Sequence, residues 1–378
     1  MFVNLRFHLC FFRINKVNEL LTQLFYNDKI VYFRSMILLR KILFPFALLY
    51  RFITGIRNFL FDKGILKSYS FDVPIIAVGN LSVGGTGKTP QIEYLIRLLS
   101  PNYKVATLSR GYKRKSKGFI LANSTSNSEI IGDEPFQFYK KFKNIQVAVD
   151  ANRKNGIEKL LSQTNKLEVI LLDDAFQHRK IKAGFYILLT SYGDLYSDDF
   201  ILPTGNLRES RAGAKRANLV IVTKCPTTLS PEEQREIQAK LNLTYTQELH
   251  FSYIDYDEFL FSELKSIKAS EVKNVDKLLL AGIAKPEPFF KYLQSEKEEQ
   301  LIFPDHHYFT EKDLMEIENK AEDKIIITTE KDFVRLKGSI SKEQLFYLPI
   351  RSSFLSAAEK FDKTITDYME TRKRMSKN

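Results

Sequence analysis

The sequence is poor in cysteine, in glycine- or proline-dominated tracts and in long uncharged apolar runs, and each absence excludes a class of protein. Its two cysteines are Cys10 and Cys225, so neither a disulfide framework nor a cysteine metal site can be proposed, which fits a reducing, cytoplasmic compartment. No tract of about 20 residues is dominated by glycine or proline, which argues against a fibrous or linker-like chain. The 44% hydrophobic content over 378 residues is typical of a globular protein with room for two domains.

An apolar segment from Met36 to Leu66 lacks the continuous run that a transmembrane helix needs. The cations that interrupt it are Arg40, Lys41, Arg51, Arg57 and Lys63. Uncharged stretches stay below about 18 residues, and Pro45 is expected to kink any helix there. No small-residue cleavage site follows, which argues against a signal peptide. The pattern favours an interfacial membrane-associated helix over the alternative of a helix docked on the protein's own core.

From Val73 onward, short β-rich runs alternate with longer amphipathic segments, which predicts an α/β fold with a doubly wound, largely parallel sheet. The predicted strands are Ile75–Val78, Val105–Ser109, Gln146–Val149, Val169–Leu172, Tyr186–Leu189, Leu219–Val222, Leu278–Gly282, Leu301–Phe303 and Ile325–Thr328. Between about Leu241 and Ser270, aromatic and polar residues alternate, as in Tyr245–Tyr256, which predicts antiparallel strands joining two lobes.

These patterns divide the chain into five parts. Residues 1–35 show no clear period and are expected to be a loose N-terminal extension or an over-extended start. The interfacial helix then occupies 36–70, a first α/β domain 71–240, a β linker or hinge 241–270, and a smaller C-terminal α/β lobe 271–378.

A glycine-rich segment follows the first predicted strand and runs into a helix. It reads Leu81-Ser-Val-Gly-Gly-Thr-Gly-Lys-Thr-Pro90. Glycines let successive backbone N–H groups point at phosphate oxygens, and a helix N-terminus adds partial positive charge. In a P-loop, Lys88 reaches the β- and γ-phosphates and Thr89 ligates Mg²⁺, although Ser82 stands where the usual pattern has its first glycine. The predicted ATP-binding residues of this P-loop NTPase-like fold are Ser82, Val83, Gly84, Gly85, Thr86, Gly87, Lys88 and Thr89.

Two carboxylates end the apolar run Leu167-Glu-Val-Ile-Leu-Leu-Asp-Asp174. A carboxylate at such a strand end is where a P-loop enzyme holds Mg²⁺, usually through water. Because successive strand side chains point to opposite faces, Asp173 and Asp174 should differ in role, and either could be the metal ligand. The alternative is a helix cap or a surface turn.

Three further motifs are weaker when each is taken alone. Gly132-Asp-Glu-Pro135 puts Asp133 at the start of a helix, where N-capping is the ordinary alternative. Leu207-Arg-Glu-Ser210 offers Arg208 and Glu209 near the phosphates, or a surface ion pair. The basic loop 109–115, which contains Arg110, either contacts phosphate groups of substrate or lipid or is a solvated charge run.

His306 and His307 follow a predicted strand of the second lobe. An isolated histidine pair is more often a surface or metal-scavenging feature than a catalytic one. On the residues alone, neither is assigned a role.

Several motifs occur together between about Met36 and Asp362. They are Val78-Gly-Asn-Leu-Ser-Val-Gly-Gly-Thr-Gly-Lys-Thr-Pro90, Leu108-Ser-Arg-Gly-Tyr112, Gly132-Asp-Glu-Pro135, Asp173-Asp-Ala-Phe-Gln-His178, Leu202-Pro-Thr-Gly-Asn-Leu-Arg-Glu209, Ala281-Gly-Ile-Ala284, Phe303-Pro-Asp-His306 and Thr329-Glu-Lys-Asp332. The combination resembles the tetraacyldisaccharide 4′-kinases of lipid A biosynthesis, whose P-loop also lacks the first glycine.

The resemblance implies site roles that the residues alone leave open. Asp133 and His306 become a catalytic pair that activates the sugar hydroxyl, and Lys88 neutralises charge on the transferring phosphoryl group. The implied metal ligands are Thr89, Asp173 or Asp174, and Glu209, and the implied substrate- and phosphate-binding residues are Arg110, Arg208 and Gln177. Because His306 comes from the second lobe and Asp133 from the first, lobe closure is expected to assemble the pair.

The resemblance also implies a reaction and a location. The γ-phosphate of ATP, with Mg²⁺, is transferred to the 4′-hydroxyl of a tetraacyldisaccharide 1-phosphate at the cytoplasmic face of the inner membrane. The expected partners are the acylated lipid and the membrane surface, with no obligate protein partner. The net charge of +12 would also suit nucleic acid, but no recognisable nucleic-acid module supports that.

The alternative function is a membrane-associated regulatory P-loop NTPase. It would share the glycine-rich loop and the lipid-seeking helix, but it would need neither Asp133 nor His306. A GTP-specific switch fits less well, because Val222-Thr-Lys-Cys225 lacks the Asn-Lys-x-Asp pattern that reads guanine.

Overall fold

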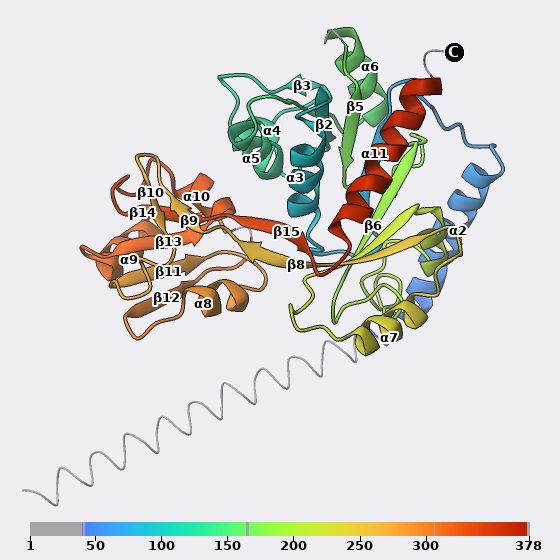
Figure 1. Ribbon diagram of the computed structural model, residues 1–378. Helices are drawn as coiled ribbons and strands as arrows, with labels where there is room; N and C mark the ends of the chain where they lie inside the picture. Colours follow the sequence, from blue (N-terminus) through green and yellow to red (C-terminus); the bar gives the residue numbers. More distant parts are fainter. Residues whose placement is uncertain (1–39, 41, 164–165, 306, 376–378) are drawn as a thin grey trace, which may run out of the picture.

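The computed structural model describes residues 40, 42–163, 166–305 and 307–375, which form two α/β lobes joined by a pair of strands (Figure 1). The predicted α/β class with a largely parallel sheet is confirmed. The predicted extension over 1–35 lies outside the described residues, as does His306.

The larger lobe is built on a nine-stranded sheet in the order β15-β8-β7-β6-β1-β5-β2-β4-β3. Its strands are β1 (Ile75–Asn80), β2 (Val105–Ser109), β3 (Ile120–Leu121), β4 (Gln146–Val149), β5 (Val169–Asp173), β6 (Phe185–Ser191), β7 (Leu219–Thr223), β8 (Glu248–Tyr256) and β15 (Ile350–Phe354). Pairing is parallel from β4 to β8 and antiparallel at both edges. Every residue of β1, β2, β5 and β7 is buried, as expected of parallel strands covered on both faces.

Helices cover both faces of this sheet. They are α2 (Phe44–Asp62), α3 (Lys88–Leu99), α4 (Ser128–Ile131), α5 (Asp133–Lys141), α6 (Arg153–Gln163), the 3₁₀ helix η1 (Arg211–Arg216), α7 (Pro231–Leu241) and α11 (Ala358–Met375). Figure 1 shows α11 lying along the larger lobe, and Phe361, Ile365 and Met369 share a core with α3 and the sheet. The prediction grouped all of 271–378 in the smaller lobe, but this last helix packs on the larger one.

The smaller lobe has a six-stranded sheet in the order β10-β9-β14-β13-β11-β12. Its elements are β9 (Phe259–Phe261), β10 (Ser266–Lys268), β11 (Lys277–Ala281), α8 (Glu287–Leu293), β12 (Glu298–Ile302), α9 (Glu311–Ala321), β13 (Ile325–Thr329), α10 (Glu330–Leu336) and β14 (Leu345–Leu348). Separate apolar clusters fill the two faces of this sheet.

The antiparallel strands predicted between the lobes are present: β8 pairs antiparallel with β15, with Tyr256 opposite Ile350, and β9 pairs antiparallel with β10. The prediction did not include the parallel pairing of β8 with β7 on its other side. The paired strands β8 and β15 run between the lobes in Figure 1. The local alternation could not reveal this arrangement, because the antiparallel partner of β8 lies far along the chain.

The helix α2 has two different faces. It begins at Phe44, directly after a turn at Leu43, so Pro45 lies in the first turn, where a residue needs no intrahelical N–H bond. Ala47 and Phe61 are buried against the protein, whereas Phe46 and Phe52 are 61% and 65% exposed. In the part of the chain that the structure describes, no helix is both long enough and apolar enough to cross a membrane.

Candidate active site

The glycine-rich loop connects β1 to α3 at the centre of the larger sheet. Gly84 and Gly87 have φ angles of 110° and 82°, which L-residues with side chains rarely adopt. Gly87 is the N-cap of α3 and makes no side-chain cap bond, so the helix presents its first N–H groups and its positive dipole end to the loop. All eight residues from Ser82 to Thr89 lie on this loop or in the first turn of α3, an arrangement that binds phosphate.

Neighbouring segments hold the loop in place. Lys224, which follows β7, donates through Nζ to the carbonyl of Gly85 at 2.5 Å, and the Thr223 hydroxyl donates to the carbonyl of Thr86 at 2.9 Å. Burial and nearby cations lower the pKa of Lys224. The sequence reasoning missed this lysine, although a lysine directly after a buried strand was a usable signal.

Asp173 ends β5 beside the loop, in register with Val78 of β1. It is buried, and its Oδ1 has no hydrogen-bond partner within the described residues. Burial, followed by repulsion from Asp174, raises the pKa of Asp173 to about 7. A buried carboxylate oxygen with no partner is costly unless a cation meets it.

Asp174 faces a different environment from its neighbour. Its carboxylate lies 3.6 Å from Lys88 Nζ and 3.1 Å from Arg208 Nη1. Burial raises the pKa of Asp174, but attraction to Lys88 and Arg208 outweighs it and lowers the pKa overall. The expectation that the two aspartates differ is therefore met, with Asp174 engaged by side-chain cations.

The residues present fit a magnesium ion. Mg²⁺ prefers oxygen ligands and is usually held by one or two carboxylates together with substrate phosphates. The unpartnered oxygen of Asp173 and the hydroxyl of Thr89 are of that type. Among the described residues there is no cluster of three or more His, Cys, Asp or Glu side chains that could hold a metal by themselves.

Glu209 and Gln177 take part in a hydrogen-bond chain rather than standing open to ligands. The Glu209 carboxylate is buried and accepts from Arg216 at 2.8 Å, Asn58 at 2.8 Å and Gln177 at 3.1 Å. Gln177 also donates to the carbonyl of Asn80 at 2.8 Å. Both oxygens of Glu209 are thus used by N–H donors, an environment unlike that of a metal ligand, so we assign it to positioning.

A buried arginine, Arg153, contacts the end of the strand that carries Asp173. Arg153 is buried and donates to the carbonyls of Asp150 at 2.6 Å and Asp173 at 3.3 Å. Burial, followed by repulsion from the positive charges of Arg153 and Arg110, lowers the pKa of His178 to about 4. The imidazole ring of His178 is therefore neutral at pH 7. Neither Arg153 nor His178 was among the predicted site residues.

Asp133 is the first residue of α5, and Gly132 rather than Asp133 is the N-cap. The ordinary capping role is therefore not what places it there. Gly132 packs against Gly111, with only 3.2 Å between its would-be Cβ and the Gly111 Cα, so the basic loop after β2 reaches the start of α5. The Asp133 carboxylate is paired with Arg335 of α10, in the other lobe.

His307 has local partners. Its ring stacks on Phe303 with centroids 4.9 Å apart, and Nε2 lies 3.0 Å from Asp313 Oδ2. Asp313 also accepts from Thr310 in the capping box that begins α9. These contacts support a structural reading for His307.

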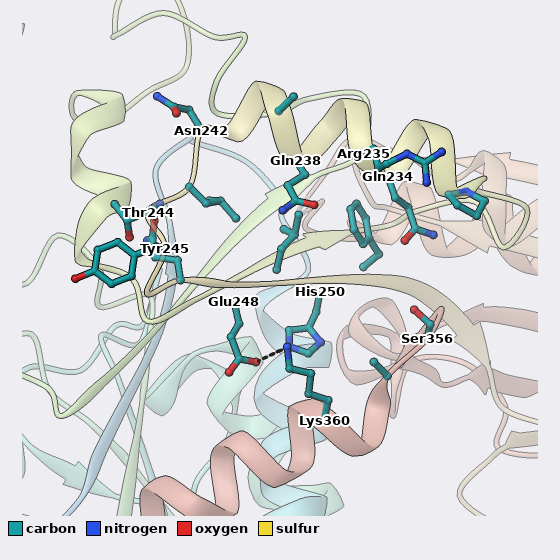
Figure 2. A pocket seen from close by; sticks show the side chains of 17 residues that line it. Gln234, Arg235, Gln238, Asn242, Thr244, Tyr245, Glu248, His250, Ser356 and Lys360 are labelled. Carbon is teal, nitrogen blue, oxygen red and sulfur yellow. Dashed lines mark hydrogen bonds and ion pairs between the residues drawn. The ribbon is translucent and has the colours of Figure 1, made fainter.

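A separate cavity of about 870 Å³ lies between α7, β8 and the start of α11 (Figure 2). His250 and Glu248 on its floor are 3.3 Å apart, and Glu248 also accepts from Thr364 of α11 at 3.2 Å. None of the predicted site residues that the structure describes lines it. These contacts join α11 to β8, and we assign the cavity no catalytic role.

Comparisons with known proteins agree with one another. A family model described as tetraacyldisaccharide-1-P 4′-kinase matches residues 39–370. The tetraacyldisaccharide 4′-kinase of Flavobacterium johnsoniae is 68% identical over 333 residues, which cover 88% of this chain and 98% of that protein. The Bacteroides thetaiotaomicron kinase of the same name is 44% identical over 362 residues, or 89% and 95% of the two chains. A crystal structure of LpxK from Aquifex aeolicus, an "apo" form in complex with ATP, has a TM-score of 0.71 and 32% identity, and covers 88% of this chain and 99% of that one.

Proposed function

This chain belongs to the tetraacyldisaccharide-1-P 4′-kinase family, and we propose how its residues carry out the reaction and where. The enzyme transfers the γ-phosphate of ATP to the 4′-hydroxyl of a tetraacyldisaccharide 1-phosphate, a precursor of lipid A. Residue roles and attachment to a membrane surface are our proposals.

The phosphates of ATP lie on the loop from Ser82 to Thr89. Backbone N–H groups of the loop and of the α3 N-terminus bind phosphate oxygens, and Lys88 reaches the transferring phosphoryl group. The observation that carries this assignment is the register of Val78 with Asp173, because it puts an unpartnered buried carboxylate oxygen beside the anion-binding loop. When bound, Mg²⁺ neutralises phosphate charge there, held by Asp173 and Thr89.

Arg208 Nη1 lies 3.1 Å from the Asp174 carboxylate, and Lys88 Nζ lies 3.6 Å from the same carboxylate. Two cations around one carboxylate leave a net positive charge, which favours the phosphoryl oxygens of the transition state. Arg110, exposed in the loop that reaches the start of α5, binds phosphate of the lipid substrate.

Asp133 accepts the proton of the 4′-hydroxyl as the hydroxyl attacks the γ-phosphorus. His306, which lies outside the described residues, is its proposed partner. Asp133 comes from the first lobe and contacts α10 of the second, so the reacting hydroxyl is placed between the lobes. Lobe closure remains the proposed means of assembling the pair.

The enzyme works as a peripheral protein at the cytoplasmic face of the inner membrane, because the acylated substrate does not readily leave the bilayer. The exposed face of α2 supports this proposal: it carries a shallow groove of about 530 Å³ at Gly55. The groove is lined by Leu48, Arg51, Phe52, Gly55, Ile56 and Phe59. Apolar side chains with a cation at their edge match the headgroup boundary of an anionic leaflet.

The residue assignment is tested with Asp133→Asn. Phosphate transfer from radiolabelled ATP to detergent-solubilised acylated disaccharide 1-phosphate should fall by about 10²–10⁴-fold, while the Kd for ATP stays near that of the wild type. Glu129→Gln, which removes an exposed carboxylate paired with Lys115, is the matched control. Transfer that survives Asp133→Asn, or that proceeds without the lipid, would contradict the proposal.

The membrane proposal is tested separately with Phe52→Asp. Burying a Phe side chain contributes about 1.5–3 kcal/mol, so its replacement by a charge should reduce flotation with vesicles of anionic phospholipid by at least about ten-fold. Tyr245→Asp, at a fully exposed aromatic outside α2, should float as the wild type does. Equal flotation of all three proteins would refute membrane attachment through α2.

A further inference from the structure

We infer that Arg335 is a further positioning residue of this kinase: it reaches from the smaller lobe to the Asp133 carboxylate and fixes the orientation of the catalytic base. The inference rests on the proposed role of Asp133. It also gives a purpose to two motifs, Ala281-Gly-Ile-Ala284 and Thr329-Glu-Lys-Asp332, that the nucleotide and metal sites leave without one.

The contact itself joins residues that are far apart in the sequence. Nη2 of Arg335 donates to Oδ2 of Asp133 across the lobe interface. The two side chains are 14% and 26% exposed, so the pair is shielded from water on most sides, where a charge-assisted hydrogen bond is stronger than at a surface. A carboxylate has about four lone-pair sites, so pairing with a guanidinium does not by itself prevent it from accepting a hydroxyl proton.

Arg335 is itself held by Asp332, one turn earlier on α10. Arg335 Nη1 lies 3.5 Å from Asp332 Oδ1. Asp332 is fully buried. Its carboxylate accepts hydrogen bonds from the backbone N–H of Gly282 at 2.8 Å and from the Thr329 hydroxyl at 2.7 Å. Asp332 therefore links Arg335 both to the end of β11 and to the start of α10.

Gly282 leaves room for the Asp332 carboxylate. A Cβ at Gly282 would lie 3.0 Å from Asp332 Oδ1 and 3.4 Å from the carbonyl oxygen of Pro304, so a larger residue would shift the carboxylate by a few tenths of an ångström. The chain of contacts runs from Gly282 through Asp332 and Arg335 to Asp133. Through these contacts, the smaller sheet fixes the orientation of the Asp133 carboxylate in the other lobe.

Other ion pairs cross the same interface, which allows positioning to be distinguished from simple lobe adhesion. Lys331 of α10 lies 3.5 Å from Glu134 of α5, and Glu330 lies 3.0 Å from Lys141. If Arg335 served only to hold the lobes together, loss of the Lys331 pair should have a comparable effect. If it orients the base, only Arg335 should affect the chemical step.

The test compares saturation kinetics of the full-length wild type, Arg335→Ala, Arg335→Lys and Lys331→Gln, with ATP·Mg²⁺ and detergent-solubilised acylated disaccharide 1-phosphate. Misplacing a catalytic group by about 1 Å can cost about 10²-fold, so Arg335→Ala should lower kcat by about that factor with the KM for ATP nearly unchanged. Arg335→Lys keeps the charge but loses the fork, and should lower kcat by about ten-fold. Lys331→Gln should keep kcat within about two-fold and change only KM.

Chemical rescue supplies a readout that a purely structural role would not change. Millimolar guanidinium chloride should restore part of kcat in Arg335→Ala, and sodium chloride at the same ionic strength should not. The inference is overturned if Arg335→Ala keeps the wild-type kcat, or if it raises KM as Lys331→Gln does and guanidinium has no effect. A thermal melt of each variant checks that it folds. If Arg335→Ala does not fold, the kcat of Arg335→Lys decides the outcome.

Failure of this inference and failure of the proposed function are distinguishable. If Asp133→Asn still transfers phosphate, the role of Asp133 fails, and with it the reason for positioning it. If Asp133→Asn is inactive while Arg335→Ala is normal, only the role of Arg335 fails.

Discussion

Replacing Asn58 on α2 should impair the nucleotide site, although Asn58 lies on the helix that faces the proposed membrane. Its Nδ2 donates to Glu209 Oε2 at 2.8 Å, and Glu209 holds Gln177, which bonds the carbonyl of Asn80 at the end of β1. Asn80 in turn accepts from Lys88 Nζ at 3.3 Å. Asn58 therefore stabilises the position of Lys88, from which we propose that Lys88 reaches phosphate.

The magnitude follows from the burial of Glu209, which is 3% exposed. A hydrogen bond to a buried charged group contributes about 1.5–3 kcal/mol, so Asn58→Ala should lower the free energy of unfolding by about that amount. If half of this loss is expressed at the loop, kcat/KM for ATP falls by roughly three- to twelve-fold, at about 1.4 kcal/mol per factor of ten. Asn58→Asp puts a second carboxylate beside Glu209 and should cost more.

The assay is ATP saturation kinetics with lipid in detergent micelles, so that vesicle binding does not limit the rate. Thr54→Ala is the matched control, because the Thr54 hydroxyl donates only to carbonyls of its own helix, at Tyr50 and Arg51, among the described residues. A wild-type kcat/KM for ATP in Asn58→Ala, with a change only in the KM for lipid, would refute the reasoning. It would mean that α2 serves substrate binding alone.

Three further outcomes are expected. In metal-free buffer the pKa of Asp173, raised by burial and by Asp174 to about 7, makes the fold less stable as pH rises towards and through 7. Denaturant unfolding at pH 8 should therefore show Asp173→Asn stabilised by about 2–4 kcal/mol, and Asp174→Asn destabilised because its pKa is lowered on balance. Gly79→Ala, whose Cβ would lie 2.7 Å from Phe176 Cβ, should cost about 1–3 kcal/mol and lower ATP affinity, measured by calorimetry. Burial raises the pKa of Cys225 to about 12, so mass spectrometry should find it unalkylated by iodoacetamide at pH 8 until the protein unfolds.

The local features of the site were predictable from the sequence, because they depend on neighbouring residues. A buried β-run, then glycines, then a helix start is enough to place the phosphate loop between β1 and α3, and all eight predicted loop residues lie there. A carboxylate at the end of the apolar run 167–174 is likewise a local pattern, and Asp173 ends β5 as expected. The α/β class followed from alternation of the same kind.

Only the tertiary structure decided which residues meet across the chain. Nothing near Glu209 in sequence indicates that Asn58 and Gln177 use its oxygens, and nothing near Asp133 indicates Arg335, 202 positions away. The return of α11 to the larger lobe and the parallel pairing of β8 are of the same kind. Sequence patterns report short-range preferences of the backbone and the polarity of each face. Ion pairs and strand partners depend on how distant segments pack, and this packing gives Asp173, Asp174 and Glu209 their different surroundings.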